Sequence, residues 1–243
     1  MRHLCLYILT ALVCAAEPDF ATNNDFFAQG MDDYRAGNFP EATRAFEQSV
    51  AQHPSAGALV NLGITQWQRG HAGAAILAWE QARWINPYYD QANSNLEFAR
   101  QVAQVSEPEL KWYEIPSTWL PPNSWVWLAG ASLWLAAGAA ILPGLLRRRK
   151  SDRQQTLAAL GLAAFLFCFT ANLGVVSRTQ IGFVLGKDAP LLLTPTTGGE
   201  VVATLTDGEP GRILRQHGMY WLIQTADGTG WIARQQFGLV VPE

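Results

Sequence analysis

Cysteine and charge are both scarce in this sequence, and their scarcity excludes several classes of protein. Only three of the 243 residues are cysteines, and Cys5, Cys14 and Cys168 all lie in or beside apolar runs. The polar stretches therefore hold no cysteine pair for a disulfide framework or a zinc site. Charged residues make up 15% of the chain and the formal net charge is −3. The basic composition typical of a nucleic-acid binder is therefore lacking too, and we expect no nucleic-acid partner.

Sequence motifs of catalysis are also lacking. The chain contains no HExxH, no GxSxG, no phosphate-binding glycine loop and no cysteine paired with a histidine in a catalytic motif. The long apolar runs hold no charged residue, and their few polar side chains, Cys168, Thr170 and Asn172, do not support transport or proton relay. We therefore expect a protein that is not an enzyme and that uses no cofactor and no metal.

The first apolar run is short and lies at the N-terminus. Arg2 precedes the apolar residues 4–13, and the small residues Cys14, Ala15 and Ala16 follow. This pattern is typical of a secretory signal peptide, and about ten apolar residues are too few to span a bilayer, which requires about 20. We expect residues 1–16 to be a signal peptide that is cleaved after Ala15 or Ala16. Lipid attachment at Cys14 is an alternative, but residues 11–13 lack the leucine and the small residue that usually precede a lipidated cysteine.

Two further apolar runs are long and uncharged. They cover residues 123–146 and 156–176. Each is long enough to cross a bilayer as a helix, and a buried helix of a soluble protein rarely stays uncharged over such a length. The sequence therefore predicts two transmembrane helices, in preference to an apolar hairpin inside a soluble core.

The loop between these runs, residues 147–155, indicates their orientation. It carries five basic residues and one acidic residue, and short loops rich in arginine and lysine stay in the cytoplasm. The topology determinants are Arg147, Arg148, Arg149, Lys150 and Arg153. Together with the signal peptide, the loop predicts a two-pass protein of the bacterial inner membrane. Its N- and C-terminal domains would then both lie in the periplasm.

Residues 23–105 contain an internal repeat with a period of about 33 residues. Small, aromatic and proline residues recur together in two units, and a third stretch at 92–100 looks like a capping helix. The matching pairs are Gly30 and Gly63, Tyr34 and Trp67, Gly37 and Gly70, Ala42 and Ala75, Phe46 and Trp79, and Pro54 and Pro87. This pattern resembles the tetratricopeptide repeat, and the resemblance implies an all-α solenoid of two repeats plus a cap.

A solenoid of this kind has a concave face lined by the first helix of each unit, and we expect that face to bind a protein partner. The candidate groove residues are Phe27, Met31, Tyr34, Val60, Asn61, Ile64, Trp67, Asn95 and Phe98. The two asparagines could bind a peptide backbone, although capping or bridging of the repeats is the favoured role. Basic residues that would clamp a terminal carboxylate are not evident on this face.

Residues 181–243 follow a linker at 106–122 and the two apolar runs, and their pattern changes to short strands separated by glycine turns. The expected strands are 189–194, 201–205, 211–215, 220–225 and 230–233. Trp221 and the sequence Gly230-Trp231-Ile232 resemble the bacterial SH3-like domain, which implies a small all-β barrel. Tyr220 and Trp221 are the candidate binding surface, although a structural role is favoured for Trp221, and Trp231 is expected in the core.

The order of these parts, with tetratricopeptide repeats, two spans and an SH3-like domain after a signal peptide, resembles the BatE-type proteins of bacterial aerotolerance operons. The resemblance implies a multidomain membrane protein with protein partners. These partners would be von Willebrand A-domain Bat proteins and a BatD-type protein, with a MoxR-type ATPase in the same system. The expected function is a non-enzymatic scaffold that assembles an envelope complex for stress or aerotolerance. The alternative is a cell-wall sensing or anchoring protein whose SH3-like domain binds peptidoglycan.

Overall fold

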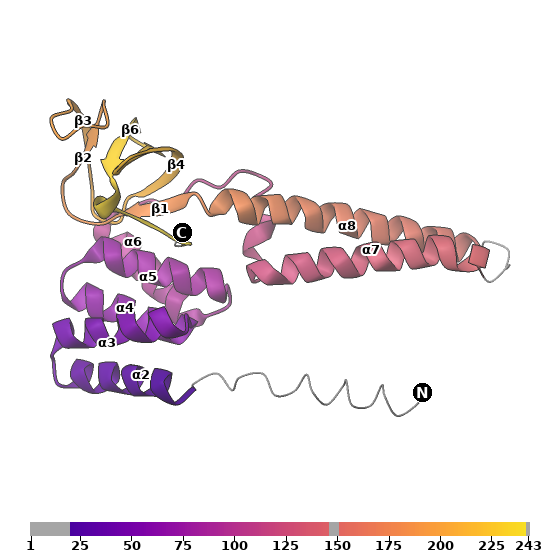
Figure 1. Cartoon of the computed structure of the whole chain (residues 1–243), viewed down its shortest axis with the longest axis horizontal. Coiled ribbons are helices and arrows are strands. Elements are labelled where there is room, and N and C mark those ends of the chain that lie inside the picture. Colours follow the sequence, from indigo (N-terminus) through magenta and orange to yellow (C-terminus); the bar gives the residue numbers. More distant parts are fainter. Residues whose placement is uncertain (1–19, 146–150, 242–243) are drawn as a thin grey trace, which may run out of the picture.

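The computed structural model describes residues 20–145 and 151–241, with side chains from Asp25 onward. The signal peptide at 1–16 and the basic residues 147–150 lie outside the described residues. Figure 1 shows two parts: a head that contains a helical array and a β-sheet, and a long helical hairpin that projects from it. The chain leaves the head through a linker, runs along the hairpin and returns to the head as the sheet.

Five helices stack side by side in the array (Figure 1). They are α2 (Phe20–Arg35), α3 (Phe39–Gln52), α4 (Ala56–Gln68), α5 (Ala72–Ile85) and α6 (Asp90–Ala103). The turns after α2 and α4 each contain a glycine with positive φ, Gly37 at 79° and Gly70 at 78°. Glycine takes this conformation without the steric cost that a Cβ would add, so both helices end where the sequence places the turns.

The repeated small and aromatic positions are in direct contact. A Cβ added at Gly30 would lie 2.8 Å from the ring of Phe46, and one at Gly63 would overlap the indole of Trp79. The indole Nε1 of Trp79 donates a hydrogen bond to the carbonyl oxygen of Val60 at 3.2 Å. The two glycines therefore allow each helix pair to approach closely around one buried aromatic ring.

The sheet contains seven antiparallel strands in the order β3-β2-β6-β5-β4-β1-β7. Their bounds are β1 (Ile181–Val184), β2 (Ala189–Leu192), β3 (Val201–Leu205), β4 (Pro210–His217), β5 (Tyr220–Thr225), β6 (Gly228–Ala233) and β7 (Phe237–Leu239). The sequence did not predict β1 and β7. These two short strands lack the turn residues that mark the others, because β1 follows a helix almost directly and β7 follows the short 3₁₀ helix η2 (Arg234–Gln236).

The expectation of a closed barrel is wrong. Strands β3 and β7 are the two edges of the sheet and do not pair with each other. The reason lies in α5, which packs against β1 and β7 and covers that edge. The amide of Gln81 on α5 donates a hydrogen bond to the carbonyl oxygen of Leu239 at 3.1 Å, which partly satisfies the edge strand.

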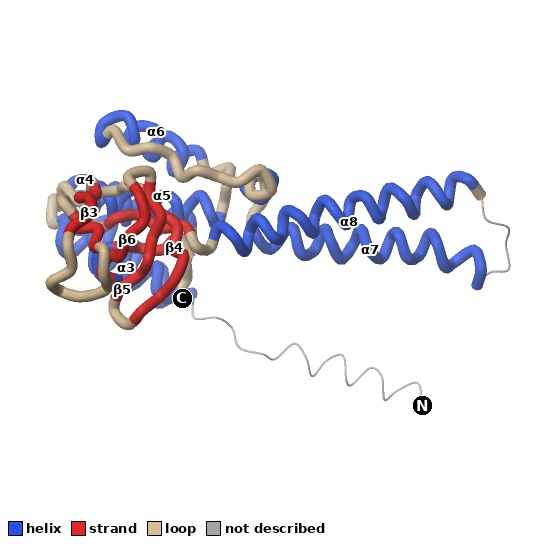
Figure 2. Tube along the Cα trace, turned by 90° about the horizontal axis from the view of Figure 1, so that it is seen from above, coloured by secondary structure: helices blue, strands red, loops and turns tan. Residues whose placement is uncertain are grey.

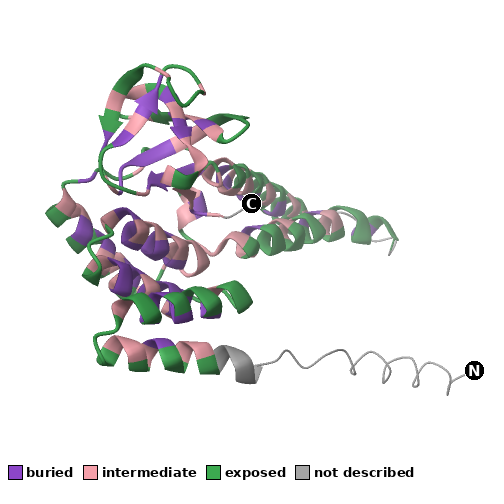
Figure 3. Cartoon of the chain, turned by 60° about the vertical axis from the view of Figure 1, so that its left-hand side comes forward, coloured by how far each residue is buried: buried purple, intermediate pink, exposed green. Residues whose placement is uncertain are grey.

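The helical array and the sheet share one hydrophobic core. Ile181, Phe183 and Val240 of the C-terminal part are buried in the same cluster as Ile76 and Trp79 of α5. Figure 3 shows buried residues both in the helices and in the adjoining sheet. The sequence treated 23–105 and 181–243 as separate domains, whereas their packing makes the head a single body.

The hairpin consists of α7 (Pro122–Leu145) and α8 (Asp152–Arg178), which lie side by side in Figure 2. With 24 and 27 residues they measure about 36 and 40 Å, against a hydrocarbon core of about 30 Å. Only 11% and 22% of their most apolar stretches are buried, so they are not core helices of the head. Both helices are long and apolar enough to cross a membrane.

Candidate functional site

Head and hairpin meet at a buried ion pair. The carboxylate of Glu114, in the linker, is fully buried and accepts two hydrogen bonds from the guanidinium of Arg212 on β4, at 2.9 and 2.8 Å. The hydroxyl of Ser177, near the end of α8, donates to the same carboxylate at 2.5 Å. The backbone N–H of Lys111 donates to its other oxygen at 2.8 Å. One carboxylate thus joins the linker, the second hairpin helix and the sheet.

The protonation of Glu114 follows from these contacts. Burial alone would raise its pKa, but the hydrogen bonds from Arg212, Ser177 and the Lys111 N–H, with the positive charge of Arg212, outweigh burial and lower the pKa below 4.5. The carboxylate is therefore charged at neutral pH. Charge-assisted hydrogen bonds are short and directional, and here they connect the linker, α8 and the sheet.

A second set of contacts surrounds the ion pair. Arg178, the last residue of α8, donates to the hydroxyl of Ser117 at 3.2 Å and lies over the ring of Trp84 at 4.9 Å. A Cβ at Gly174 would lie 3.0 Å from the Cα of Glu114, so the linker crosses α8 where the helix has no side chain. We use the name junction for Glu114, Ser117, Ser177, Arg178 and Arg212.

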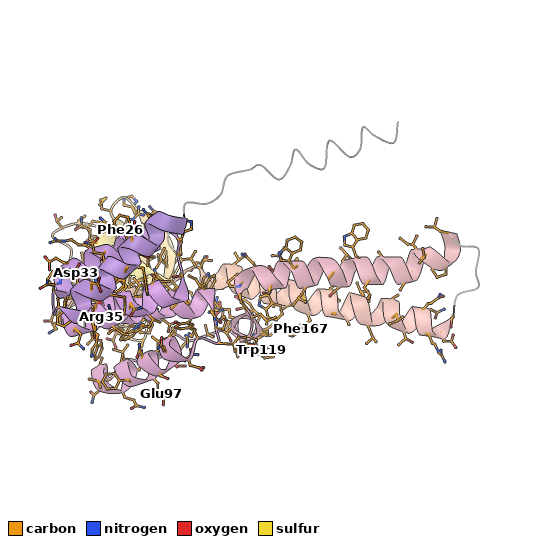
Figure 4. The ribbon with its side chains drawn as sticks, turned by 90° about the horizontal axis from the view of Figure 1, so that it is seen from below. Phe26, Asp33, Arg35, Glu97, Trp119 and Phe167 are labelled. Atoms are coloured by element: carbon orange, nitrogen blue, oxygen red, sulfur yellow. The ribbon has the colours of Figure 1, made fainter. Side chains whose placement is uncertain are left out.

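The base of the hairpin is lined with aromatic residues. Trp119 and Phe167 lie together in Figure 4, with ring centroids 6.3 Å apart. Trp125 is buried against Cys168 and Ala171 and contacts Phe167 as well, at 6.0 Å. Trp112 and Trp127 are 77% and 79% exposed. Aromatic residues of this kind concentrate at the level of the lipid headgroups.

The structure brings only part of the predicted groove together. Trp67 on α4 contacts Phe98 on α6, with ring centroids 5.7 Å apart, and Phe98 remains 55% exposed. Ile64 and Trp67 are half-buried and pack against the core of the head. These three side chains form an apolar patch across α4 and α6.

The other predicted groove residues lie elsewhere. On α2, Phe27 contacts Phe46 at 5.8 Å, Tyr34 contacts Phe39 at 5.5 Å, and Met31 is half-buried. These α2 rings pack against α3 within their own helix pair.

Two of the remaining positions have roles inside the fold. Val60 is buried in the core, so it does not line an open groove. The amide of Asn61 donates to the carbonyl oxygen of Gly57 at 2.9 Å, in its own helix. Asn95 is half-buried on α6.

On the sheet, Trp221 lies in the core and Trp231 does not. Trp221 is buried against Phe237, at 6.0 Å between ring centroids, with the guanidinium of Arg234 over its ring. Trp231, expected in the core, is half-buried and contacts the exposed His217 at 6.1 Å. Side chains alternate along a strand, and buried Gly230 and Ile232 place Trp231 on the opposite face of β6. Tyr220 is half-buried and Trp221 is buried, so Trp221 does not belong to the candidate binding surface of the sheet.

Sequence reasoning missed the junction. Glu114, Arg178 and Arg212 are not among the site residues that the sequence predicts. The partners are up to 98 residues apart, and no local spacing links a linker acid to a strand arginine. The one available signal was the charge of Arg178 directly after an apolar run.

Of the topology determinants, Arg153 alone lies in the described part of the chain, exposed in the first turn of α8. Within residues 25–145 and 151–241, no group of three or more histidine, cysteine, aspartate or glutamate side chains is placed to hold a metal ion. Comparison with protein families, with curated proteins and with solved structures gives no match for this chain.

Proposed function

We propose that this protein is a non-enzymatic, membrane-anchored scaffold. The observation that carries the proposal is the junction, because Glu114 ties the sheet, the linker and the hairpin together through hydrogen bonds at a buried point. A rigid connection of this kind suits a protein that holds a binding surface at a fixed height and angle above a bilayer. The apolar outer surface of the hairpin supports its insertion into lipid.

In the proposed orientation the head lies in the periplasm and residues 147–155 face the cytoplasm. The basic loop of the sequence supports this orientation, and the exposed aromatics at the base of the hairpin support its insertion to that depth. The patch of Ile64, Trp67 and Phe98 is the proposed surface for a protein partner. Large apolar side chains on a rigid surface are the usual anchors of protein interfaces.

The proposed partners follow from the resemblance to BatE-type proteins. They are von Willebrand A-domain Bat proteins and a BatD-type protein in the envelope, with a MoxR-type ATPase in the same system. The cytoplasmic loop offers this ATPase little besides Arg147, Arg148, Arg149, Lys150 and Arg153. We therefore propose that coupling to the ATPase runs through other membrane subunits.

Binding to purified partners tests the scaffold function. The full chain in detergent is immobilised, and the affinities of a von Willebrand A-domain Bat protein and a BatD-type protein are measured. Phe98→Ala should weaken the binding of one of them at least tenfold, which corresponds to about 1.4 kcal/mol. The matched control is Met219→Ala, which removes a 62% exposed side chain from the sheet and should leave the affinity unchanged. Lack of binding by both proteins would count against the scaffold function with these partners.

A specific observation also favours a second function, the binding of cell wall. Trp231 and His217 form a partly exposed aromatic surface on the sheet, and rings of this kind stack against sugars. If the sheet binds peptidoglycan, the full chain in detergent should sediment with purified sacculi, and Trp231→Ala should abolish the effect. Sedimentation that is unchanged in Trp231→Ala would exclude this surface.

A further inference from the structure

A pocket of about 340 Å³ lies where the helical array, the linker, the hairpin and the sheet meet. It is a different site from the apolar patch on α4 and α6. Four of the side chains that line it are charged. The lining side chains that matter here are Glu80, Arg83, Trp84, Glu107, Thr118 and Arg178.

Two carboxylates and two arginines line the pocket, and a third arginine, Arg100, pairs with both carboxylates. Glu80 is buried and pairs with Arg83 at 2.8 Å and with Arg100 at 2.5 Å, and Arg100 also pairs with Glu107. The carboxylates of Glu80 and Glu107 are therefore already paired with Arg83 and Arg100. Within the described residues, no carboxylate oxygen lies within 4.0 Å of Arg178. One guanidinium charge thus remains without an ion-pair partner at the wall of the pocket.

The contacts that Arg178 does make leave most of its donors unused. One nitrogen donates to Ser117, and the face of the guanidinium lies over Trp84. A guanidinium carries five N–H donors in a planar fork that matches the oxygens of a phosphate or a carboxylate. Stacking on Trp84 sets the plane of the Arg178 guanidinium, and the N–H groups along the edge of the guanidinium remain available to an anion.

The position of the pocket indicates the kind of anion. Arg178 is the last residue of α8, and Thr118 lies just before α7, so the pocket is level with the ends of both apolar helices. The exposed Trp112 and Trp119 of the linker lie at the same end of the hairpin. In a membrane-inserted hairpin this is the level of the lipid headgroups.

We propose that the pocket binds the phosphate of an anionic phospholipid headgroup, held by Arg178 with Arg83 beside it. The lipid would come from the leaflet that faces the head. A bound phosphate would supply the ion-pair partner that Arg178 lacks, and the volume suits a glycerophosphate group. The proposal rests on the membrane insertion of the hairpin but not on any protein partner. A soluble phosphate has the same chemistry, so the test must separate the two sources.

Native mass spectrometry of the full chain in a non-ionic detergent tests the proposal. Phosphatidylglycerol and the zwitterionic phosphatidylcholine are titrated separately, and the affinity of the first bound lipid is measured. We expect phosphatidylglycerol to bind preferentially, with affinity at least tenfold lower in Arg178→Gln. The matched control is Arg153→Gln, which removes the same charge from the opposite end of the same helix and should behave like the wild type.

Two further measurements complete the design. Arg178→Lys keeps the charge but not the fork, and it should retain part of the affinity. Thermal unfolding of each variant shows whether the head is intact, because Arg178 also packs on Trp84.

Equal binding of the two lipids, or unchanged affinity in folded Arg178→Gln, would overturn the proposal. Displacement of phosphatidylglycerol by millimolar inorganic phosphate would assign the pocket to soluble phosphate instead. Failure of the chain to bind partner proteins would leave the lipid result unaffected, so the two proposals fail separately.

Discussion

Glu114 and Arg212 are 98 residues apart and form a bidentate ion pair whose carboxylate is completely buried. The pair joins a linker that precedes the hairpin to a strand that follows it. Ser177 adds a third part of the chain, since its hydroxyl donates to the same carboxylate. The hairpin thus enters and leaves the head at one point.

Arg212→Ala should destabilise the head strongly. It leaves the Glu114 carboxylate buried without its cation, and removal of one partner from a buried pair costs about 3–5 kcal/mol. The control is Arg35→Ala, which breaks an exposed pair with Asp32 and should cost at most about 1 kcal/mol. Denaturant unfolding of the full chain in detergent measures both. Equal effects of the two substitutions would show that the junction does not stabilise the head.

Glu114 and Glu209 should affect the pH dependence of the free energy of unfolding in opposite directions. The pKa of Glu114 is lowered below 4.5, because hydrogen bonds from Arg212, Ser177 and the Lys111 N–H outweigh the effect of burial. Its stabilising contribution is present above about pH 4.5 and disappears as the pH falls through the lowered pKa. Glu114→Gln should therefore reduce the loss of melting temperature in acid. A wild-type acid profile in this variant would contradict the assignment.

Glu209 should act in the reverse sense. Burial, with the nearby charge of Asp227, raises its pKa above 4.5 despite hydrogen bonds from Thr206 and Thr225. Its contribution is present below about pH 4.5 and is lost as the pH rises through the raised pKa. Glu209→Gln keeps the side chain neutral, so its melting temperature should exceed that of the wild type at pH 7 and match it at pH 4. A lower melting temperature at pH 7 would be inconsistent with this account.

Gly63→Ala should disturb the array although alanine is the better helix former. The added Cβ would overlap the indole of Trp79, and overpacking of a core typically costs about 1–3 kcal/mol. Gly57→Ala in the same helix is the matched control, because the nearest atom to its Cβ, the hydroxyl oxygen of Tyr89, is 3.6 Å away. That control should be neutral or stabilising by up to about 1 kcal/mol. The melting temperature of Gly63→Ala should therefore lie below that of Gly57→Ala.

The sequence predicted the local features of this protein better than its long-range contacts. Gly37 and Gly70 mark turns that depend on one residue's conformation, and the uncharged runs predicted both long helices from composition alone. The junction depends on contacts between distant parts of the chain, which periodicity does not encode. The same limit explains Trp231, which was expected in the core but lies on the other face of β6, because the buried face of a strand is decided by neighbouring strands and not by residue type.

The shared core predicts that helices and sheet unfold together. Phe183 on β1 is buried in the cluster that includes Ile76 and Trp79. Phe183→Ala should lower the free energy of unfolding by about 3–5 kcal/mol. The circular dichroism of the helices and the tryptophan fluorescence should still change together, in a single transition. Val202→Ala at the exposed edge of the sheet is the control and should have little effect. Separate transitions for the helical array and the sheet would mean that the head is two independent domains.

Cysteine accessibility in intact cells measures whether this chain is a two-pass anchor with the whole head on the outer side of the inner membrane, as proposed. Single cysteines at Gln68, Gln155 and Gln235, all exposed positions, are introduced into a chain without native cysteines and treated with a membrane-impermeant maleimide. Gln68→Cys and Gln235→Cys should react in intact cells, whereas Gln155→Cys should react only after the inner membrane is permeabilised. Labelling of Gln155→Cys in intact cells, or of only one of the two head positions, would contradict the proposed topology.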